Sequence, residues 1–113
     1  MHTPDALAAL SALAQESRLA IFRYLVTLGP AGQAATRIGE HLAIPASSLS
    51  FHLKELSRAG LITSRQESRF IIYAANFAQM NGLIAFLTEN CCGGNPCSPT
   101  AGACAIDTST ASP

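Results

Sequence analysis

The sequence predicts a mainly α-helical domain with one small β-hairpin. Two observations support this prediction: apolar residues recur at helical spacing along most of residues 1–89, and the spacing becomes strand-like only after Gly60. Hydrophobic residues make up 49% of the 113-residue chain and charged residues 12%. Because disorder goes with low hydrophobicity and high net charge, we expect residues 1–89 to fold as a domain. Residues 90–113, rich in Gly, Pro, Ser, Thr and Ala, are expected to form a flexible tail.

The first two helices are marked by capping residues and apolar spacing. Thr3 can cap the first helix, with Pro4 at its first helical position, and its spacing is set by Leu7, Leu10 and Leu13. The second helix runs from about Glu16 to Leu28, where Gly29-Pro30 stops it.

Two shorter helices follow, joined by a tight turn. The first covers about Ala34 to Leu42, and the turn is Ala43-Ile44-Pro45. Pro45 lies at the entry of the next helix, which ends at Ala59-Gly60. Its apolar face is formed by Leu49, Leu53 and Leu56.

Two alternating runs, residues 61–66 and 69–74, predict a hairpin with Glu67-Ser68 as its turn. A last helix is expected from about Phe77 to Glu89. Two short helices followed by a hairpin is the layout of a winged helix-turn-helix, in which the second short helix enters the major groove of DNA.

The overall charge does not indicate a polybasic nucleic-acid-binding protein, but it allows a locally basic face that binds DNA. The formal net charge is zero, but residues 37–69 hold five basic and three acidic side chains. The residues expected to face the groove are Ser47, Ser48, Ser50, Phe51 and His52. The expected phosphate contacts are Lys54, Arg65 and Arg69. A structural helical domain with a solvated basic face is the alternative.

Two motifs carry a family resemblance. The segment 12–22 (ALAQESRLAIF) and the segment 48–62 (SLSFHLKELSRAGLI) resemble the opening and the recognition helix of the ArsR/SmtB family of metal-responsive repressors. The resemblance covers about residues 5–89. It implies a homodimeric repressor that binds double-stranded operator DNA and dimerises through its first and last helices.

The chain departs from the family pattern at both usual sensing sites. The recognition helix has no cysteine near its start, and residues 76–89 offer Glu89 but no histidine. Instead, Cys91 and Cys92 follow the last expected helix, with Cys97 and Cys104 beyond. This arrangement resembles family variants that bind trivalent arsenic just past that helix.

The chemistry of the cysteines agrees with this resemblance. Thiolates select thiophilic ions, and trivalent arsenic takes three of them. We expect arsenic(III), or antimony(III), to bind Cys91, Cys92 and Cys97 as an inducer, with Cys104 as a further candidate ligand. A sensor of another thiophilic metal ion, a thiol-redox regulator and a metallochaperone remain open alternatives.

Other function classes are not indicated. The sequence shows no paired carboxylates, Ser-His-Asp set or phosphate-binding glycine loop, so an enzyme is not expected. No apolar run approaches the ~18 residues of a membrane span. The N-terminus lacks the basic segment of a signal peptide, so a cytoplasmic protein is expected.

Overall fold

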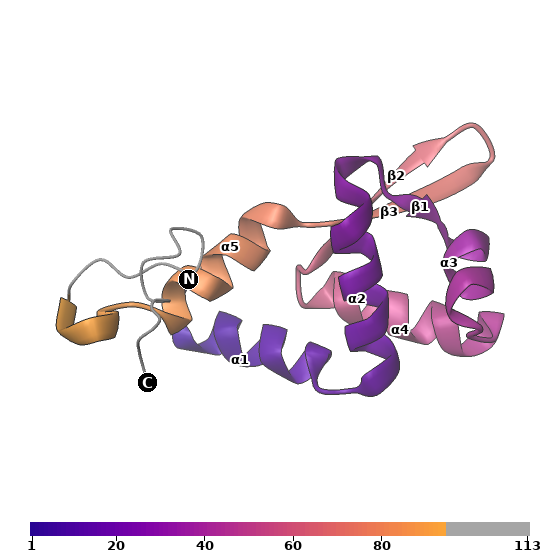
Figure 1. Cartoon of the computed structure of the whole chain (residues 1–113). Coiled ribbons are helices and arrows are strands. Elements are labelled where there is room, and N and C mark those ends of the chain that lie inside the picture. Colours follow the sequence, from indigo (N-terminus) through magenta and orange to yellow (C-terminus); the bar gives the residue numbers. More distant parts are fainter. Residues whose placement is uncertain (95–113) are drawn as a thin grey trace, which may run out of the picture. The chain divides into compact units, whose positions relative to one another are not determined.

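The structure, a computed structural model, describes residues 1–94 (Figure 1). The chain divides into two units, Met1–Leu83 and a second unit that begins at Ile84. The five helices of the described part are α1 Thr3–Leu13, α2 Glu16–Leu28, α3 Ala35–Leu42, α4 Ala46–Arg58 and α5 Phe77–Leu87. The strands and short 3-10 helices are β1 Gln33–Ala34, β2 Ile62–Glu67, β3 Phe70–Ala75, η1 Gly29–Ala31 and η2 Cys91–Gly94. No helix within residues 1–94 is long and apolar enough to cross a membrane.

The core of the first unit lies among α2, α3, α4 and the sheet. α2 packs on α4 and on β3, and α3 packs on α4. The largest fully buried side chains are Ile21, Leu25, Ile38, Leu56 and Leu61. The apolar spacing predicted for these helices is therefore confirmed at these buried positions, whereas Leu19 of α2 is 43% exposed.

Helix α1 begins one residue earlier than predicted, so its cap is His2 and not Thr3. His2 occupies the cap position in an extended conformation, and its backbone N–H donates to Oδ2 of Asp5 at 3.2 Å. Thr3 is thus the first helical residue and Pro4 the second. The prediction of Thr3 as cap was wrong because Asp5, one turn inside the helix, satisfies the N–H of His2.

The buried face of α1 is made of alanines. Ala6, Ala9 and Ala12 face α2 and α4 and are buried, whereas Leu7 is 61% exposed and Leu10 40%. Small side chains let the backbone of α1 approach its neighbours closely. The leucines that mark this helix in the sequence therefore point away from the core of their own subunit.

The sheet contains a strand that the sequence did not reveal. Its order is β1-β3-β2, with both pairs antiparallel. β1 has two residues, and Gln33 is opposite Tyr73. Gly32, which precedes it, has a φ of +66°, and a Cβ there would clash with the carbonyl oxygen of Tyr73. Glycine is therefore required for the chain to enter the sheet at this point.

The hairpin is confirmed with its turn one residue later than predicted. Glu67 is opposite Phe70, so Ser68 and Arg69 form the turn, rather than Glu67 and Ser68. Ser68 has a φ of +58°, a value that usually favours glycine, asparagine or aspartate. The absence of a glycine hid the turn position from the sequence pattern. We call this hairpin, β2 and β3, the wing.

Asn76 joins the end of α4 to the start of α5. Its side chain accepts from the backbone N–H of Gln79 at 3.2 Å and donates through Nδ2 to the carbonyl of Gly60 at 3.0 Å. Its own N–H donates to the carbonyl of Leu61 at 2.8 Å. α5 begins at Phe77 as predicted and ends at Leu87, two residues before the predicted end.

Candidate nucleic-acid interface and cysteine segment

The turn between α3 and α4 sets these two short helices close together. Ala43 adopts the left-handed conformation with a φ of +56°, and the N–H of Ile44 donates to the carbonyl of Gly39 at 3.0 Å. A left-handed residue of this kind is a common helix stop. Pro45 then caps α4 in an extended conformation. The predicted turn Ala43-Ile44-Pro45 is confirmed.

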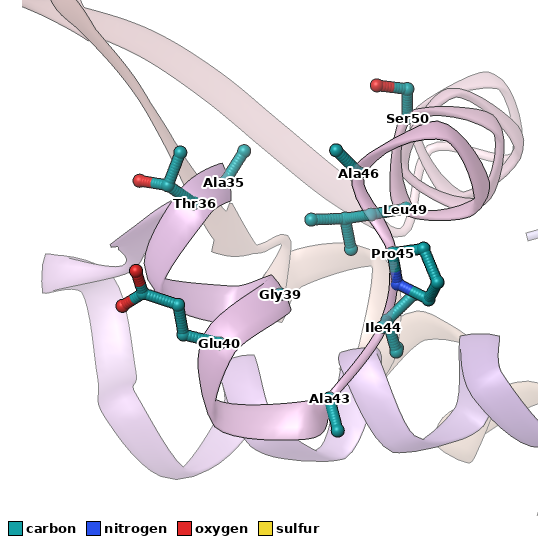
Figure 2. A pocket seen from close by; sticks show the side chains of 10 residues that line it. All are labelled: Ala35, Thr36, Gly39, Glu40, Ala43, Ile44, Pro45, Ala46, Leu49 and Ser50. Carbon is teal, nitrogen blue, oxygen red and sulfur yellow. The ribbon is translucent and has the colours of Figure 1, made fainter.

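An open pocket of about 640 Å³ lies between the two short helices (Figure 2). Thr36 and Glu40 come from α3, and Ala46, Leu49 and Ser50 from α4. A Cβ at Gly39 would stand 3.2 Å from Cδ2 of Leu49. The small residues on both sides therefore hold α3 and α4 in close contact while leaving their outer surfaces open.

Helix α4 separates its apolar and polar residues sharply. Leu49, Leu53 and Leu56 are buried, and five of the predicted DNA-contacting residues are exposed: Ser47, Ser48, Ser50, Phe51 and Lys54. At 100° per residue, the positions directly opposite the buried leucines are Ser47, Phe51, Lys54 and Arg58. We call these four residues the outer ridge of α4. Arg58 also forms an ion pair with Glu55 at 3.3 Å.

His52 lies beside the outer ridge rather than on it. The residue is half-buried, and its Nδ1 atom is buried with no hydrogen-bond partner among the described residues. The ring of Phe51 meets the imidazole edge-on, with centroids 5.8 Å apart. His52 thus lies at the edge of the core, while its assignment as a DNA contact stays a prediction.

Arg65 of the wing is held by its own chain. Its Nε donates to Oε2 of Glu67 at 2.6 Å, and its terminal nitrogens donate to the carbonyls of Pro30 at 3.2 Å and Ala31 at 2.8 Å. These bonds tie β2 to η1. Three of the five N–H donors of the guanidinium are used in this way, so the predicted phosphate contact by Arg65 has fewer donors available.

Arg69 lies at the tip of the wing and is exposed. Among residues 1–94 no side chain or carbonyl group pairs with its guanidinium. Phe70, next to it, is 55% exposed. The two wing arginines therefore differ: Arg65 stabilises the wing, and Arg69 is available to an external anion.

Residues 88–90 connect α5 to η2, which contains Cys91 and Cys92. We call the chain from Cys91 onward the cysteine segment. Cys91 is half-buried and Cys92 exposed. Burial raises the pKa of the Cys91 thiol, and the hydrogen bond and charge of Cys92 raise that pKa further. Cys92 and Gly93 both have positive φ, which places the two thiols on a sharp bend.

The predicted three-thiolate site extends beyond the described residues. Cys97 and Cys104 lie outside residues 1–94. Within that range no three His, Cys, Asp or Glu side chains come together as a metal site. Cys91, Cys92, Cys97 and Cys104 therefore remain predicted ligands.

Sequence reasoning missed the tether between the wing and η1. Its acceptors are the backbone carbonyls of Pro30 and Ala31, which no side-chain motif can announce. The Gln33–Ala34 strand was missed for a similar reason, since two residues give no readable alternation.

Comparisons with known proteins indicate the kind of domain that carries these surfaces. A helix-turn-helix domain model matches residues 13–65. A search of curated protein sequences finds no match. Among solved structures, an ArsR-like transcriptional regulator from Rhodococcus sp. RHA1 has 29% identity and a TM-score of 0.67, with 77% of this chain and 78% of that chain covered.

Two further structures resemble the chain. One is named as a possible transcriptional regulator for arsenical resistance, with 26% identity, a TM-score of 0.58 and coverage of 71% of this chain and 83% of that chain. The other is a homodimeric winged helix-turn-helix domain from Mycobacterium bovis, with 21% identity, a TM-score of 0.61 and coverage of 77% and 81%. At 21% identity, the Mycobacterium bovis structure supports the fold of this chain and nothing further.

The fold is that of a winged helix-turn-helix, as predicted. The domain match and the regulator neighbours indicate a DNA-binding regulator and not an enzyme. The chain is therefore similar to helix-turn-helix transcriptional regulators, among them the ArsR-like regulator from Rhodococcus.

Proposed function

We propose that this protein is a dimeric repressor that binds operator DNA and releases it when arsenic(III), or antimony(III), binds its C-terminal cysteine thiolates. The observation that carries the DNA-binding part is the outer ridge of α4. Its side chains are polar, basic or aromatic, and the opposite face of the helix is buried leucine. A helix with this division can enter a major groove without exposing the core.

The wing supports the same function. Arg69 is exposed at its tip, and a guanidinium there suits a phosphate of the adjacent backbone. The tether of Arg65 to η1 holds the middle of β2 in place, four residues before Arg69. Phosphate contacts, Lys54 among them, position the protein on the duplex, while Ser47 and Phe51 of the ridge face the base edges.

Dimerisation is supported by α1. Leu7 and Leu10 are exposed on a helix whose buried face is alanine. Exposed leucines of this kind favour an apolar partner, and a second copy of the chain would supply the same surface in a two-fold arrangement. The homodimeric winged helix-turn-helix domain of similar fold agrees with this proposal.

The choice of inducer follows from the donor set. Cys91 and Cys92 are adjacent, and Cys92 is one cause of the raised pKa of the Cys91 thiol. Two thiolates at such short range suit a thiophilic ion better than magnesium or calcium, which prefer oxygen. Cys97 is the proposed third ligand, and Cys104 is a further candidate ligand. The name of one structural neighbour, which refers to arsenical resistance, agrees with this choice.

Release requires that the inducer prefer the conformation that does not bind DNA. A ligand shifts such an equilibrium only through its differential affinity for the two states. We propose that closure of the cysteine segment behind α5 favours a dimer whose recognition helices no longer match two half-sites one helical turn apart. A coupling of about 1–3 kcal/mol would weaken DNA binding roughly 5- to 150-fold.

The test is fluorescence anisotropy on an operator duplex, titrated with arsenite, antimonite and other thiophilic ions. Cys91→Ser, Cys92→Ser and Cys97→Ser are expected to bind DNA normally and to stay bound when arsenite is added. Cys104→Ser is the matched control and is expected to release DNA almost as the wild type does.

Two outcomes would contradict the proposal. Arsenite affinity that is the same with and without operator would show that the thiols are not coupled to release, because coupling must be reciprocal. Release by an oxidant but not by arsenite would favour the thiol-redox alternative.

A further inference from the structure

We infer that Phe51 reads the C5-methyl group of a thymine in each operator half-site. This inference rests on the proposed DNA-binding function and adds one named base to it. The observation is the position of an exposed aromatic ring in the middle of an otherwise polar ridge. Phe51 is 56% exposed and lies between Ser47 and Lys54 along the outer ridge of α4.

The exposure of Phe51 is not explained by packing within the chain. The buried face of α4 is formed by leucines, and the ring contact of Phe51 is the edge-on meeting with His52. Within α4 it is the sole large apolar side chain that is exposed. A protein-docking surface would need further apolar residues beside it. The neighbours on the ridge are a hydroxyl and an ammonium group, which suit DNA instead.

The major groove offers one apolar group to such a ring. Thymine presents its C5-methyl there, whereas the other three bases present hydrogen-bond donors and acceptors. Phenylalanine has no polar atom with which to pair with those groups. Apolar contact with the thymine methyl is thus the interaction that the side chain of Phe51 can make with a base edge.

The surroundings of the ring restrict where it can reach. His52 is half-buried, and its ring contacts Phe51 from the edge, which limits the rotation of Phe51 toward that side. Ser47 lies one turn toward the N-terminus and Lys54 almost one turn toward the C-terminus. We therefore place the thymine near the centre of the half-site, flanked by positions addressed by a hydroxyl and by a cationic group.

The experiment begins with duplexes that the wild-type protein selects from a randomised library. Each thymine of the selected duplex is then replaced by uracil, which removes the methyl group and keeps the base pair and its O4 acceptor. One central replacement in a single half-site is expected to weaken wild-type binding about fourfold, the effect of returning one apolar carbon to water.

The variant that tests the assignment is Phe51→Ala. It is expected to bind the thymine and uracil duplexes equally, while Phe51→Leu keeps part of the preference because it remains apolar. Phe70→Ala is the matched control, since Phe70 is exposed to almost the same degree (55%) but lies on the wing. It is expected to keep the full fourfold preference. Circular dichroism confirms that each variant is folded.

The outcomes separate this inference from the function on which it rests. If no sequence is enriched by the wild type, the proposed DNA-binding function fails. If a sequence is enriched but no uracil replacement weakens binding, or if Phe51→Ala keeps the methyl preference, the assignment of Phe51 is overturned while the function stands.

Discussion

Helices α1 and α4 distribute their large apolar side chains in opposite ways. α4 buries leucine and exposes serine, phenylalanine and lysine. α1 buries alanine and exposes Leu7 and Leu10. Both helices belong to the first unit and pack on α2 (Figure 1).

The difference shows that the exposed face of a helix indicates what kind of partner it contacts. Burying small residues and exposing large apolar ones leaves α1 with its main hydrophobic surface unused inside the subunit. Burying the large residues leaves α4 with a polar outer surface. We therefore expect the outer face of α1 to contact protein and that of α4 to contact DNA.

The largest effect is expected for Leu7→Asp on α1. A leucine moved from water into an interface contributes about 1.5–3 kcal/mol, and two-fold symmetry counts it twice. The dimer should therefore be weakened by about 3–6 kcal/mol, and operator binding should fall with it. Sedimentation equilibrium measures this change.

The matched control for Leu7→Asp is Thr27→Asp, which places the same charge at an exposed position of α2. It should leave the dimer intact. A Leu7→Asp protein that remains fully dimeric would break the comparison between α1 and α4.

Leu56→Ala tests the buried side of α4. Leu56 is fully buried, so its truncation should lower the free energy of unfolding by about 2–5 kcal/mol. Urea denaturation at fixed protein concentration measures the loss. Ser57→Ala, one residue along and exposed, should change it by less than about 0.5 kcal/mol. Similar losses in both variants would contradict the assignment of faces.

These two helices also show what periodicity can and cannot predict. The 3.6-residue spacing predicted both helices because it requires only that apolar residues share a face. It does not say whether that face meets the same subunit or another one. In α1 the spacing of Leu7 and Leu10 marked the outer face, and the alanines beside them, which carry little hydrophobic signal, formed the inner one.

Arg65→Ala extends the comparison to the wing. The variant loses two bonds to backbone carbonyls and an exposed ion pair with Glu67, so the free energy of unfolding should fall by about 1 kcal/mol. DNA binding should weaken because the wing is no longer tethered to η1. The slope of log K against log salt should change less than in Arg69→Ala, since three donors of Arg65 are already used within the chain. A slope reduced as much as in Arg69→Ala would make Arg65 a phosphate contact, as its charge alone predicts.

The smallest effect on stability is expected for Arg69→Ala. Arg69 has no partner within residues 1–94, so the free energy of unfolding should stay within about 0.5 kcal/mol of the wild type. Binding should weaken about equally on all DNA sequences, and the salt slope should fall by roughly one per subunit. Anisotropy titrations at several salt concentrations measure both. An unchanged slope would remove Arg69 from the interface.

The part of the site that depends on side-chain spacing could be predicted from the sequence. The exposure of Ser47, Ser48, Ser50, Phe51 and Lys54 follows from the spacing of the buried leucines. The role of Arg65 was not predictable, because its partners are carbonyl groups of a segment more than thirty residues away. Backbone acceptors have no sequence signature. A basic side chain near a predicted interface is therefore expected to bind phosphate until the fold shows which carbonyl groups it already contacts.

Asn76 has a mechanical consequence. Its three hydrogen bonds make the C-terminal end of α4 and the first turn of α5 a shared joint. A tilt of α5 would therefore be passed to the C-terminal end of α4, and the displacement of α4 would be largest at its far end, near Ser47. With 13 residues at about 1.5 Å each, α4 is a lever of roughly 20 Å. A tilt of about 10° would move its tip by roughly 3 Å, which is as long as a hydrogen bond to a base.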